Sequence, residues 1–538
     1  MREKIKKLLH DFIPEDAKIE ISVPELEANG HYSTNVAFLL SKERKQPPMV
    51  VAESLAKRVL ETAPAGFFKR VSAASPGFLN FWIADGAWQE ELGAILKMKN
   101  KYGRVTPRGT RGEFAKKRIQ VEYVSANPTG PLTLANGRGG FFGDVLSNVL
   151  KWTGHGVEGE YYVNDTGNQI LTLGKSLLAV LGVLPDDENF YRGGYIAEWA
   201  KKNRRIVLAH KGKPLKLGKR AAKDFLKSIK TTLEKKAGIK FDRWTSEDKH
   251  IYKKNFVKKA REIFERKGFA YSKEGALWLK TAELGDDKDR VIVTSDGSPT
   301  YFLADAGHYL ETKKRGFDAK INILGPDHYG YVARIQAAAK ILDLPDSRVI
   351  ITQAVRLTGG GEEVKMSKRK GVFTTFEELV KEVGRDAARF FFLMHSVGSH
   401  MDFDLALAKE RSQKNPVYYA QYAYVRAASI LRKLTTNNRR PITKKLNSLN
   451  TKEDLALIRL LARLPEVLRD IAEDYQVHHL TRYALELARA FHNFYERERI
   501  IGEKNADLAK ARLALVLATK QIFEDLFKVL GISAPRKM

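Results

Sequence analysis

The middle of the chain alternates between short hydrophobic runs and stretches with helical spacing. After Arg118, the run "IQVEYV" places apolar residues at every second position, which is typical of a half-buried strand. Apolar residues from Phe142 to Val149 then recur at the i, i+3, i+4, i+7 spacing of one helix face. Further strands are predicted at "EGEYYV", "RVIVTS", "KINILG" and "RVIITQAV". This alternation predicts a multidomain α/β protein with a doubly wound, Rossmann-like parallel sheet.

Different patterns flank this central region. The first hundred residues combine two helical stretches with a strand-like "GFLNFWI" and end in the linker-like "TPRGTRGEFAKKR". From about residue 376 the spacing is helical to the end, and Thr375 with Glu378 predicts a capping box. We therefore predict an N-terminal α+β domain over 1–108, a sheet domain over 109–385 and an all-α bundle over 386–538. A helical, Lys-rich insertion is expected to interrupt the sheet near 170–285.

The charge balance indicates a polyanionic partner. The chain has 93 Lys and Arg residues against 64 Asp and Glu residues, a formal net charge of +29. Residues 201–240 alone hold 15 Lys or Arg residues against only Asp224 and Glu234. A solvated helix face explains such a run, but the excess also suits a surface that meets nucleic-acid phosphates.

Several classes of protein are excluded or disfavoured by composition. The chain contains no cysteine, which rules out disulfides, a thiolate nucleophile and zinc held by cysteine. We expect no protein-bound structural metal. The charged start "MREKIKKLLHDFIPED" has no signal-peptide core, and apolar runs such as 177–184 are too short to cross a bilayer. These features predict a cytoplasmic protein that makes no membrane contact.

The segment "PLTLANGRGG", residues 131–140, lies between a predicted strand and a predicted helix. We expect Asn136 to cap the helix, leaving the N–H groups of residues 137–139 free for an anion. The glycines would admit a ligand closely. The spacing from Gly137 through Gly139 to Gly143 is one residue too long for a dinucleotide fingerprint, so an oxidoreductase is a weak alternative. A tight structural turn is an equally good interpretation of this segment alone.

A second loop carries the stronger chemical signal. "GGGEEVKMSKRKGVFTTFEEL" places Lys365, Lys368, Arg369 and Lys370 on a glycine-flanked loop before a capped helix. Cations on such a loop can close over a triphosphate and stabilise the charge that develops on a pyrophosphate leaving group.

The string "KMSKR" resembles the signature loop of class I aminoacyl-tRNA synthetases. Eight further segments of this chain resemble bacterial arginyl-tRNA synthetases. They are "VEYVSANPTGPL", "GDVLSNVL", "YYVNDTGNQI", "SDGSPTYFLAD", "GPDHYGYVARI", "DAARFFFLM", "NPVYYAQYAYVR" and "GISAPRKM". This resemblance runs from near residue 20 to the C-terminus. It implies ATP-dependent ligation of L-arginine to tRNA(Arg) through an arginyl-adenylate, with release of AMP and pyrophosphate. It also implies Mg²⁺ with the ATP, a monomer, an N-terminal domain that contacts tRNA and a helical anticodon-binding domain.

The resemblance also assigns roles to individual residues. It implies that arginine is bound by Glu122, Ser125, Asn127, Glu247, Tyr301 and Asp305. The ATP site would use Asn136, Gly137, Asp327, His328, Gly330, Met366, Ser367 and Lys368, and catalysis would use Thr133, Asn136, Lys365 and Lys368. Contacts to tRNA are expected from Tyr419, Tyr422, Arg426 and Tyr495, since aromatic rings beside arginines suit unpaired bases. Core packing is the ordinary explanation for aromatic residues at helical spacing.

One departure from the family pattern bears on activity. The family carries H-x-G-H where this chain has Thr133-Leu134-Ala135-Asn136. Thr133 and Asn136 can donate hydrogen bonds, but neither can become cationic. Losing one positioned donor commonly costs about 10²- to 10³-fold in rate. Because the pocket carboxylates remain, we predict a working ligase; a catalytically impaired, tRNA-binding paralogue is the alternative.

Overall fold

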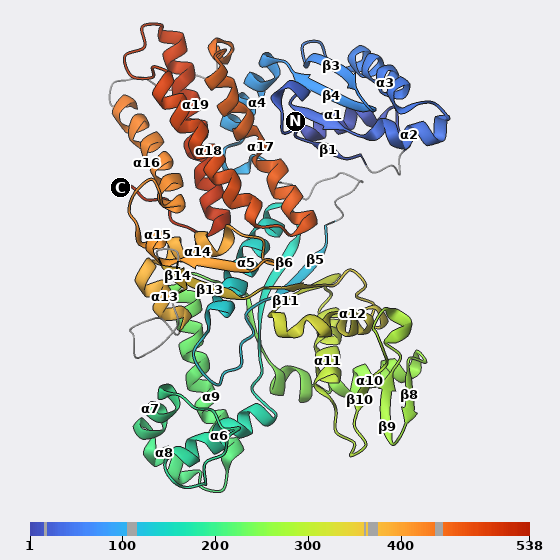
Figure 1. The fold of residues 1–538 in the computed structure, drawn as a ribbon, viewed down its shortest axis with the longest axis vertical. Coiled ribbons are helices and arrows are strands. Elements are labelled where there is room, and N and C mark those ends of the chain that lie inside the picture. The colour runs from blue at the N-terminus through green and yellow to red at the C-terminus, as the bar shows by residue number, and fades with distance from the viewer. Residues whose placement is uncertain (15–18, 105–115, 360–361, 364–374, 436–444) are drawn as a thin grey trace.

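The computed structural model describes residues 1–14, 19–104, 116–359, 362–363, 375–435 and 445–538 (Figure 1). The N-terminal domain and a helical bundle lie side by side at one end of the molecule, with the central sheet below the bundle and two lobes beyond it (Figure 1). Among the described residues, no helix combines the length and hydropathy needed to span a membrane.

The centre of the molecule is a five-stranded parallel sheet in the order β12-β11-β5-β6-β7. From β5 the chain continues to β6 and β7 on one side of the sheet. From β11 it continues to β12 on the other side. The boundary between β5 and β11 is therefore the switch point at which open α/β sheets bind ligands beyond the carboxyl ends of their strands. The strands are β5 (Arg118–Glu122), β6 (Gly156–Val163), β7 (Arg243–Ser246), β11 (Ala319–Leu324) and β12 (Arg348–Ile351).

Two helices sandwich this sheet. α5 (Leu134–Trp152) packs close to it because glycines replace larger side chains: a Cβ on Gly143 would lie 2.4 Å from the Tyr123 ring. α11 (Tyr301–Lys314) covers the opposite face, where the alternating strand residues are polar. This polar layer positions the candidate site.

The insertion between β6 and β7 is shorter than predicted. Its helices form a lobe with a hydrophobic core of their own. The sheet resumes at β7, so the expected helical interruption of 170–285 is wrong beyond the π-helix Thr231–Lys236. The helices of this lobe are α6 (Asn168–Val180), α7 (Gly194–Lys202), α8 (Arg204–Ala209) and α9 (Pro214–Lys230).

A second lobe follows β7 and also departs from the prediction. "RVIVTS" is not a strand of the parallel sheet; its residues 290–293 form β10 of an antiparallel sheet in the order β10-β9-β8. This lobe contains α10 (Phe256–Arg266), β8 (Ala270–Lys273), β9 (Ala276–Leu279), β10 (Arg290–Val293) and α12 (Val332–Ile341), with short helical turns at Glu247–Tyr252, Ala282–Leu284 and Pro326–Tyr331.

The segment after the central sheet is mixed rather than wholly helical. Residues 401–404 form β15, which pairs in parallel with β13, so the prediction of helix throughout from residue 376 is wrong there. The predicted capping box of Thr375 and Glu378 is confirmed at the start of α13. The elements are β13 (Val355–Gly359), β14 (Glu362–Glu363), α13 (Phe376–Val383), α14 (Arg385–Leu393), β15 (Met401–Asp404) and α15 (Leu405–Lys409).

The C-terminal bundle and the N-terminal domain pack against each other through α4 and α17. The bundle consists of α16 (Pro416–Thr435), a turn at Leu446–Ser448, α17 (Lys452–Asp474), α18 (His478–Arg497) and α19 (Ala506–Leu530). The N-terminal sheet has the order β1-β2-β4-β3. Its elements are α1 (Arg2–His10), β1 (Ile21–Ser22), Glu27–Asn29, β2 (Tyr32–Thr34), α2 (Val36–Arg44), α3 (Pro48–Thr62), β3 (Phe68–Ala74), β4 (Phe78–Ile83), α4 (Asp85–Met98) and Lys99–Lys101.

Candidate active site

The start of α5 differs from the predicted arrangement. The helix cap is Thr133, not Asn136, and the two residues form a reciprocal capping box. The Asn136 Oδ1 atom accepts hydrogen bonds from the Thr133 backbone N–H and hydroxyl, both at 2.9 Å. The N–H groups left at the helix start are therefore those of Leu134 and Ala135 rather than those of 137–139. Because Oδ1 is engaged, the Nδ2 amide of Asn136 is the side-chain donor that remains for a ligand.

The glycines of this segment serve packing. A Cβ on Gly137 would lie 2.2 Å from the Phe376 ring, and one on Gly140 would lie 2.8 Å from Ile239. Arg138 is buried and donates to the carbonyls of Gln353 and Ser396. Side chains of the protein itself thus occupy the space beside these glycines. The role of Gly137 in ATP binding stays a prediction.

Glu122 ends β5 and opens a strained loop at the switch point. Val124 and Ser125 have φ values of 70° and 37°, in the left-handed region that β-branched residues in particular rarely adopt. The turn brings the Ser125 hydroxyl back to Glu122, where it donates to Oε1 at 3.0 Å. Strain of this kind clusters at binding and catalytic sites, where surrounding contacts enforce it.

Three carboxyl groups converge beyond the ends of β5 and β7. We call Glu122, Glu247 and Asp305, with the neighbouring Tyr162, Tyr252 and Tyr331, the acidic pocket. Burial, followed by the charges of Asp305 and Asp165, raises the pKa of Glu247 to about 7. Burial also raises the pKa of Asp305, although the Tyr331 hydroxyl donates a hydrogen bond to this carboxyl. The pocket therefore carries negative charge that a cationic ligand would stabilise.

Glu122 is compensated differently. Its burial favours protonation, but the Lys320 ammonium and His308 outweigh burial and hold the pKa of this carboxyl below its usual value. Lys320 Nζ lies 2.8 Å from Glu122 Oε2. Glu122 is thus an ionised member of the pocket, whereas Glu247 titrates near neutrality.

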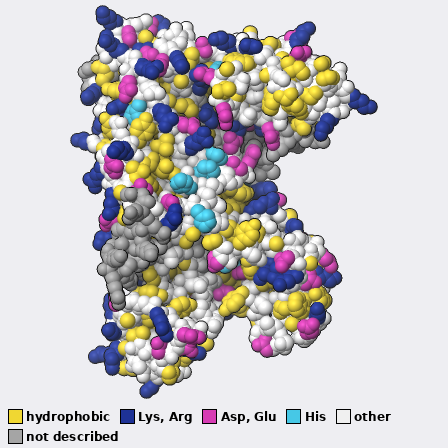
Figure 2. Space-filling model, viewed as in Figure 1, with side chains coloured by type: hydrophobic (Ala, Val, Ile, Leu, Met, Phe, Trp, Pro, Cys, Tyr) yellow, Lys and Arg dark blue, Asp and Glu magenta, His cyan; other side chains and the backbone are white. Residues whose placement is uncertain are grey.

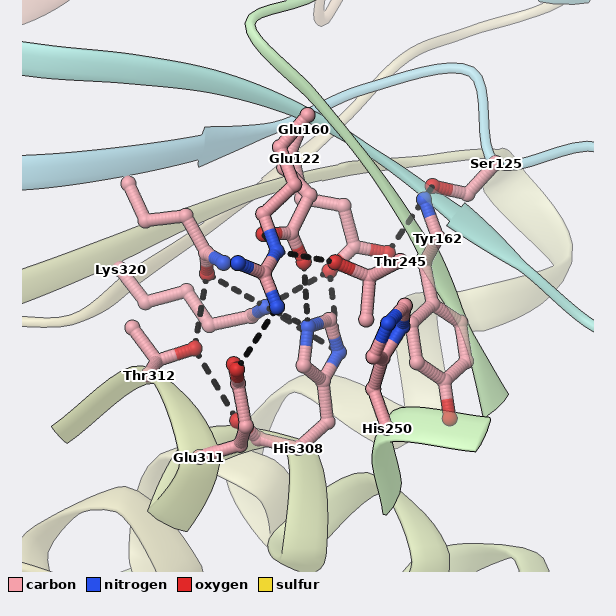
Figure 3. A network of polar contacts seen from close by, with 12 residues as sticks. Glu122, Ser125, Glu160, Tyr162, Thr245, His250, His308, Glu311, Thr312 and Lys320 are labelled. Atoms are coloured by element: carbon pink, nitrogen blue, oxygen red, sulfur yellow. Dashed lines mark hydrogen bonds and ion pairs between the residues drawn. The ribbon is translucent and has the colours of Figure 1, made fainter. Parts of the chain in front are cut away.

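A layer of paired charges lies between the sheet and α11, and Figure 3 shows Glu160, His308 and Glu311 of this layer in one network with Glu122. We call Glu158, Glu160, Arg243, His308, Glu311 and Arg315 the ion-pair layer. His308 Nε2 is 2.6 Å from Glu160 Oε1, and Arg315 is 2.7 Å from Glu160 Oε2. Arg315 also pairs with Glu158 and Glu311. Each carboxylate of this layer has a cationic partner, as buried charges require.

Of the remaining predicted arginine-site residues, Tyr301 lies at the rim of the pocket and Asn127 lies outside it. Tyr301 begins α11 one turn before Asp305 and is 73% exposed. Burial raises the pKa of Tyr252 to about 12. The nearby Glu247, Asp305 and Tyr301 add to this rise. Asn127 is exposed, and its Oδ1 accepts from Asn164 Nδ2 at 2.9 Å. Five of the six predicted arginine-site residues therefore belong to the pocket or its rim. Asn127 lies in the same loop as Ser125, but its side chain bonds Asn164.

The predicted nucleotide residues are only partly described. Asp327, His328 and Gly330 lie in the exposed turn Pro326–Tyr331, and His328 Nε2 is 3.4 Å from Asp327 Oδ2. In the part of the chain that the structure describes, no group of three His, Asp or Glu side chains could hold a metal ion. Lys365, Met366, Ser367 and Lys368 lie outside the described residues, as do Arg369 and Lys370.

The four residues nominated for RNA contacts gather around His492. Arg426 lies 4.7 Å from the ring centres of both Tyr422 and Tyr495, and it also bonds His492 Nδ1 at 3.0 Å. Tyr419 packs its ring 4.8 Å from that of His492. Burial and the Arg426 charge lower the pKa of His492 to about 4. The group combines aromatic rings with a cation, as RNA-binding surfaces do. Tyr495 is the most exposed of its rings, and Tyr419 and Tyr422 are partly buried.

Sequence reasoning missed Tyr162, Tyr252, His308, Lys320 and Tyr331, which complete or support the pocket. Their partners lie far away in the sequence. Lys320, for example, pairs with Glu122, which lies 198 positions earlier. The one available signal was a lysine at the start of the apolar strand "KINILG".

Known families cover most of the chain. The family model for the arginyl tRNA synthetase N terminal domain matches residues 1–83, that for the tRNA synthetases class I (R) catalytic domain matches 92–392, and that for the DALR anticodon binding domain matches 420–538. The chain belongs to the arginyl-tRNA synthetases. The predicted family and fold class are thereby confirmed.

Relatives agree with this assignment. The arginine–tRNA ligase of Carboxydothermus hydrogenoformans is 41% identical over 97% of this chain and 95% of its own length. That of Syntrophotalea carbinolica is 38% identical over 98% and 95%. A solved putative arginyl-tRNA synthetase from Campylobacter jejuni superimposes with a TM-score of 0.74 at 32% identity, covering 84% of this chain and 99% of that chain. The Thermus thermophilus arginyl-tRNA synthetase has a TM-score of 0.77 at 20% identity over 100% and 99%, a likeness of fold.

Proposed function

We propose that this arginyl-tRNA synthetase joins L-arginine to tRNA(Arg) and that the acidic pocket is its arginine site. The observation that carries the proposal is the convergence of Glu122, Glu247 and Asp305 beyond the ends of β5 and β7, with two of their pKa values raised. Arginine brings a guanidinium and an ammonium group. Carboxylates bind both through charge-assisted hydrogen bonds, and a guanidinium suits a bidentate carboxylate.

The reaction follows from holding two substrates in contact. The arginine carboxylate attacks the α-phosphorus of ATP, forming arginyl-adenylate and releasing pyrophosphate. A ribose hydroxyl at the tRNA terminus then attacks the arginyl carbonyl and releases AMP. The chain contributes positioning and charge stabilisation, and no covalent bond to the enzyme is required.

The nucleotide side of the proposal rests on the start of α5. The N–H groups of Leu134 and Ala135 and the Asn136 Nδ2 amide are donors at the positive end of a helix, which favours phosphate oxygens. Lys365 and Lys368 are proposed as the cations that stabilise the leaving pyrophosphate. Mg²⁺ would enter with ATP, bound mainly through phosphate oxygens.

The proposed partners are consistent with the surface. ATP, arginine and tRNA are the substrates of the family. Lys and Arg side chains are spread over every lobe of the face seen in Figure 2, which suits a long polyanion better than a small anionic ligand. The monomeric state and the cytoplasmic location stay predictions. An inactive tRNA-binding paralogue is less favoured, because the pocket retains all three of its carboxylates.

Arginine attachment to tRNA, measured with ATP and magnesium, tests the proposal. The unmodified chain should charge tRNA, and Lys368→Ala should reduce charging strongly while tRNA binding is retained. A Thr133→His/Asn136→His variant restores the family pattern beside it. Charging by that variant alone would identify the natural chain as an impaired enzyme. Failure of both chains to charge bound tRNA would overturn the proposed activity.

A further inference from the structure

A fully buried lysine lies directly behind the proposed arginine site. Lys320, on β11, is 0% exposed. Its Nζ atom lies 2.8 Å from Glu122 Oε2 and 2.7 Å from Gln120 Oε1 on the neighbouring strand. The parallel register sets Lys320 beside Gln120 and Asn322 beside Glu122. The backbone of two paired strands therefore fixes the meeting of this cation with Glu122 (Figure 3).

The two oxygens of Glu122 have different surroundings. Oε2 accepts from Lys320 and, at 2.9 Å, from Asn322 Nδ2, and the Asn322 amide is itself oriented by the Tyr309 hydroxyl. Oε1 accepts only the Ser125 hydroxyl among the described residues. Because a carboxylate oxygen has two lone pairs, Oε1 keeps room for another donor. The described residues thus engage Oε2 twice and Oε1 once.

The neighbouring carboxylate shows why this lysine is needed. Glu160 stands beside Glu122 in the register of β5 and β6. It pairs with Arg315 at 2.7 Å, and His308 Nε2 lies 2.6 Å from its other oxygen. His308 Nδ1 lies farther from Glu122, at 3.6 Å. Lys320 is therefore the nearest cation to Glu122 among the described residues.

We propose that Lys320 is a positioning residue of the arginine site: its ammonium anchors Oε2 of Glu122 and leaves Oε1 for a cationic group of the substrate. The inference rests on the proposed function, because it takes arginine as the ligand. Lys320 acts through Glu122 and does not itself contact arginine. Charged and titratable groups facing Glu122 come from three elements: Lys320 on β11, His308, Asp305 and Tyr309 on α11, and Glu160 and Tyr162 on β6.

The test compares Lys320→Met and Lys320→Arg with the unmodified enzyme, from about pH 6 to about pH 9. An opposite charge at this range shifts a carboxyl pKa by about 1–3 units, so its loss lets buried Glu122 take up a proton. Lys320→Met should raise the arginine KM at least about tenfold near neutral pH, and this KM should fall more steeply with rising pH than that of the unmodified enzyme. The KM for ATP should stay within about twofold. Lys320→Arg should restore most of the arginine affinity.

A matched control and a double variant separate positioning from general damage. Lys117 pairs with Asp346 on the surface at the other end of β5, so Lys117→Met should leave the arginine KM unchanged. In a Glu122→Gln background, Lys320→Met should add little further loss, because its effect is exerted through the carboxylate. This double variant also buries no uncompensated charge, so it keeps the test available if Lys320→Met alone does not fold.

Three results would overturn the inference. One is an unchanged pH profile in Lys320→Met, and another is an equal rise in the KM values for arginine and ATP. The third is full multiplication of the two single effects in the double variant. If the unmodified protein neither binds arginine by calorimetry nor charges tRNA, the proposed function fails and the inference fails with it. Binding and charging by the unmodified protein, with any of the three results, would refute the role of Lys320 alone.

Discussion

The acidic pocket and the neighbouring ion-pair layer differ in how their carboxylates are compensated by cationic partners. In the layer, Glu160 meets both Arg315 and His308, and its pKa is held well below the usual value: burial would raise it, but those partners outweigh burial. In the pocket, burial and neighbouring carboxylates raise the pKa values of Glu247 and Asp305. Charges that the chain neutralises itself support the fold, whereas charges left for a ligand create a binding site at some cost in stability.

The largest expected effect comes from breaking the layer. Arg315→Met should lower the free energy of unfolding by about 3–5 kcal/mol, because it removes one partner from buried charge pairs. Chemical unfolding followed by tryptophan fluorescence measures this loss. Arg261→Met, which breaks an exposed pair with Glu265, should change stability by less than about 0.5 kcal/mol. Equal effects of the two substitutions would contradict the structural role of the layer.

Next in size is the loss of a pocket carboxylate. Asp305→Asn should lower kcat/KM for arginine by about 100- to 1000-fold, since it removes one partner of a buried charge pair with the substrate. Aminoacylation at varied arginine concentration measures the change. Binding of tRNA, which uses other surfaces, should persist. A loss smaller than about tenfold would remove Asp305 from the arginine site.

Relieving the pocket should stabilise the fold. Glu247 is buried, and its pKa of about 7 lies above its ordinary value. Such a carboxyl destabilises the native state most above the folded pKa, and the penalty fades as the pH falls toward the unfolded pKa. Glu247→Gln should therefore raise the free energy of unfolding by up to about 3 kcal/mol near pH 8, and by little near pH 4.5. It should also weaken arginine binding, and a stability gain that is independent of pH would contradict this explanation.

The smallest expected effect needs no substitution. If ionised Glu247 binds arginine, the arginine KM should rise about tenfold as the pH falls from about 8 to about 6. Steady-state kinetics at saturating ATP and tRNA measures the profile. Glu247→Gln should flatten this profile, whereas a rise of the same size in that variant would assign the titration to another group.

The sequence predicted the elements better than their partners. Alternation located "IQVEYV" and "KINILG" in the parallel sheet correctly. The apolar run in "RVIVTS" could not reveal an antiparallel neighbour, because hydrophobic patterning reports burial rather than strand direction. The four-residue β15 was missed because so short a run barely establishes a period.

The site was predictable only as far as local sequence carried it. Both Thr133 and Asn136 are good cap residues, and the choice between them depends on the reciprocal bonds of the folded turn. Glu122, Glu247 and Asp305 came from the family resemblance, because they are spread over 184 positions of the chain. The partnership of Lys320 with Glu122 depends on strand register, which no local pattern records.

The most direct test of the uncompensated charge at Glu247 is the number of protons released when arginine binds. Calorimetry near pH 7, repeated in buffers of different ionisation enthalpy, measures this number. A cation bound beside Glu247 lowers its pKa, so the enzyme should release about half a proton from that carboxyl, less near pH 8.5, and correspondingly less in Glu247→Gln. Arginine binding without proton release near pH 7 would contradict the account.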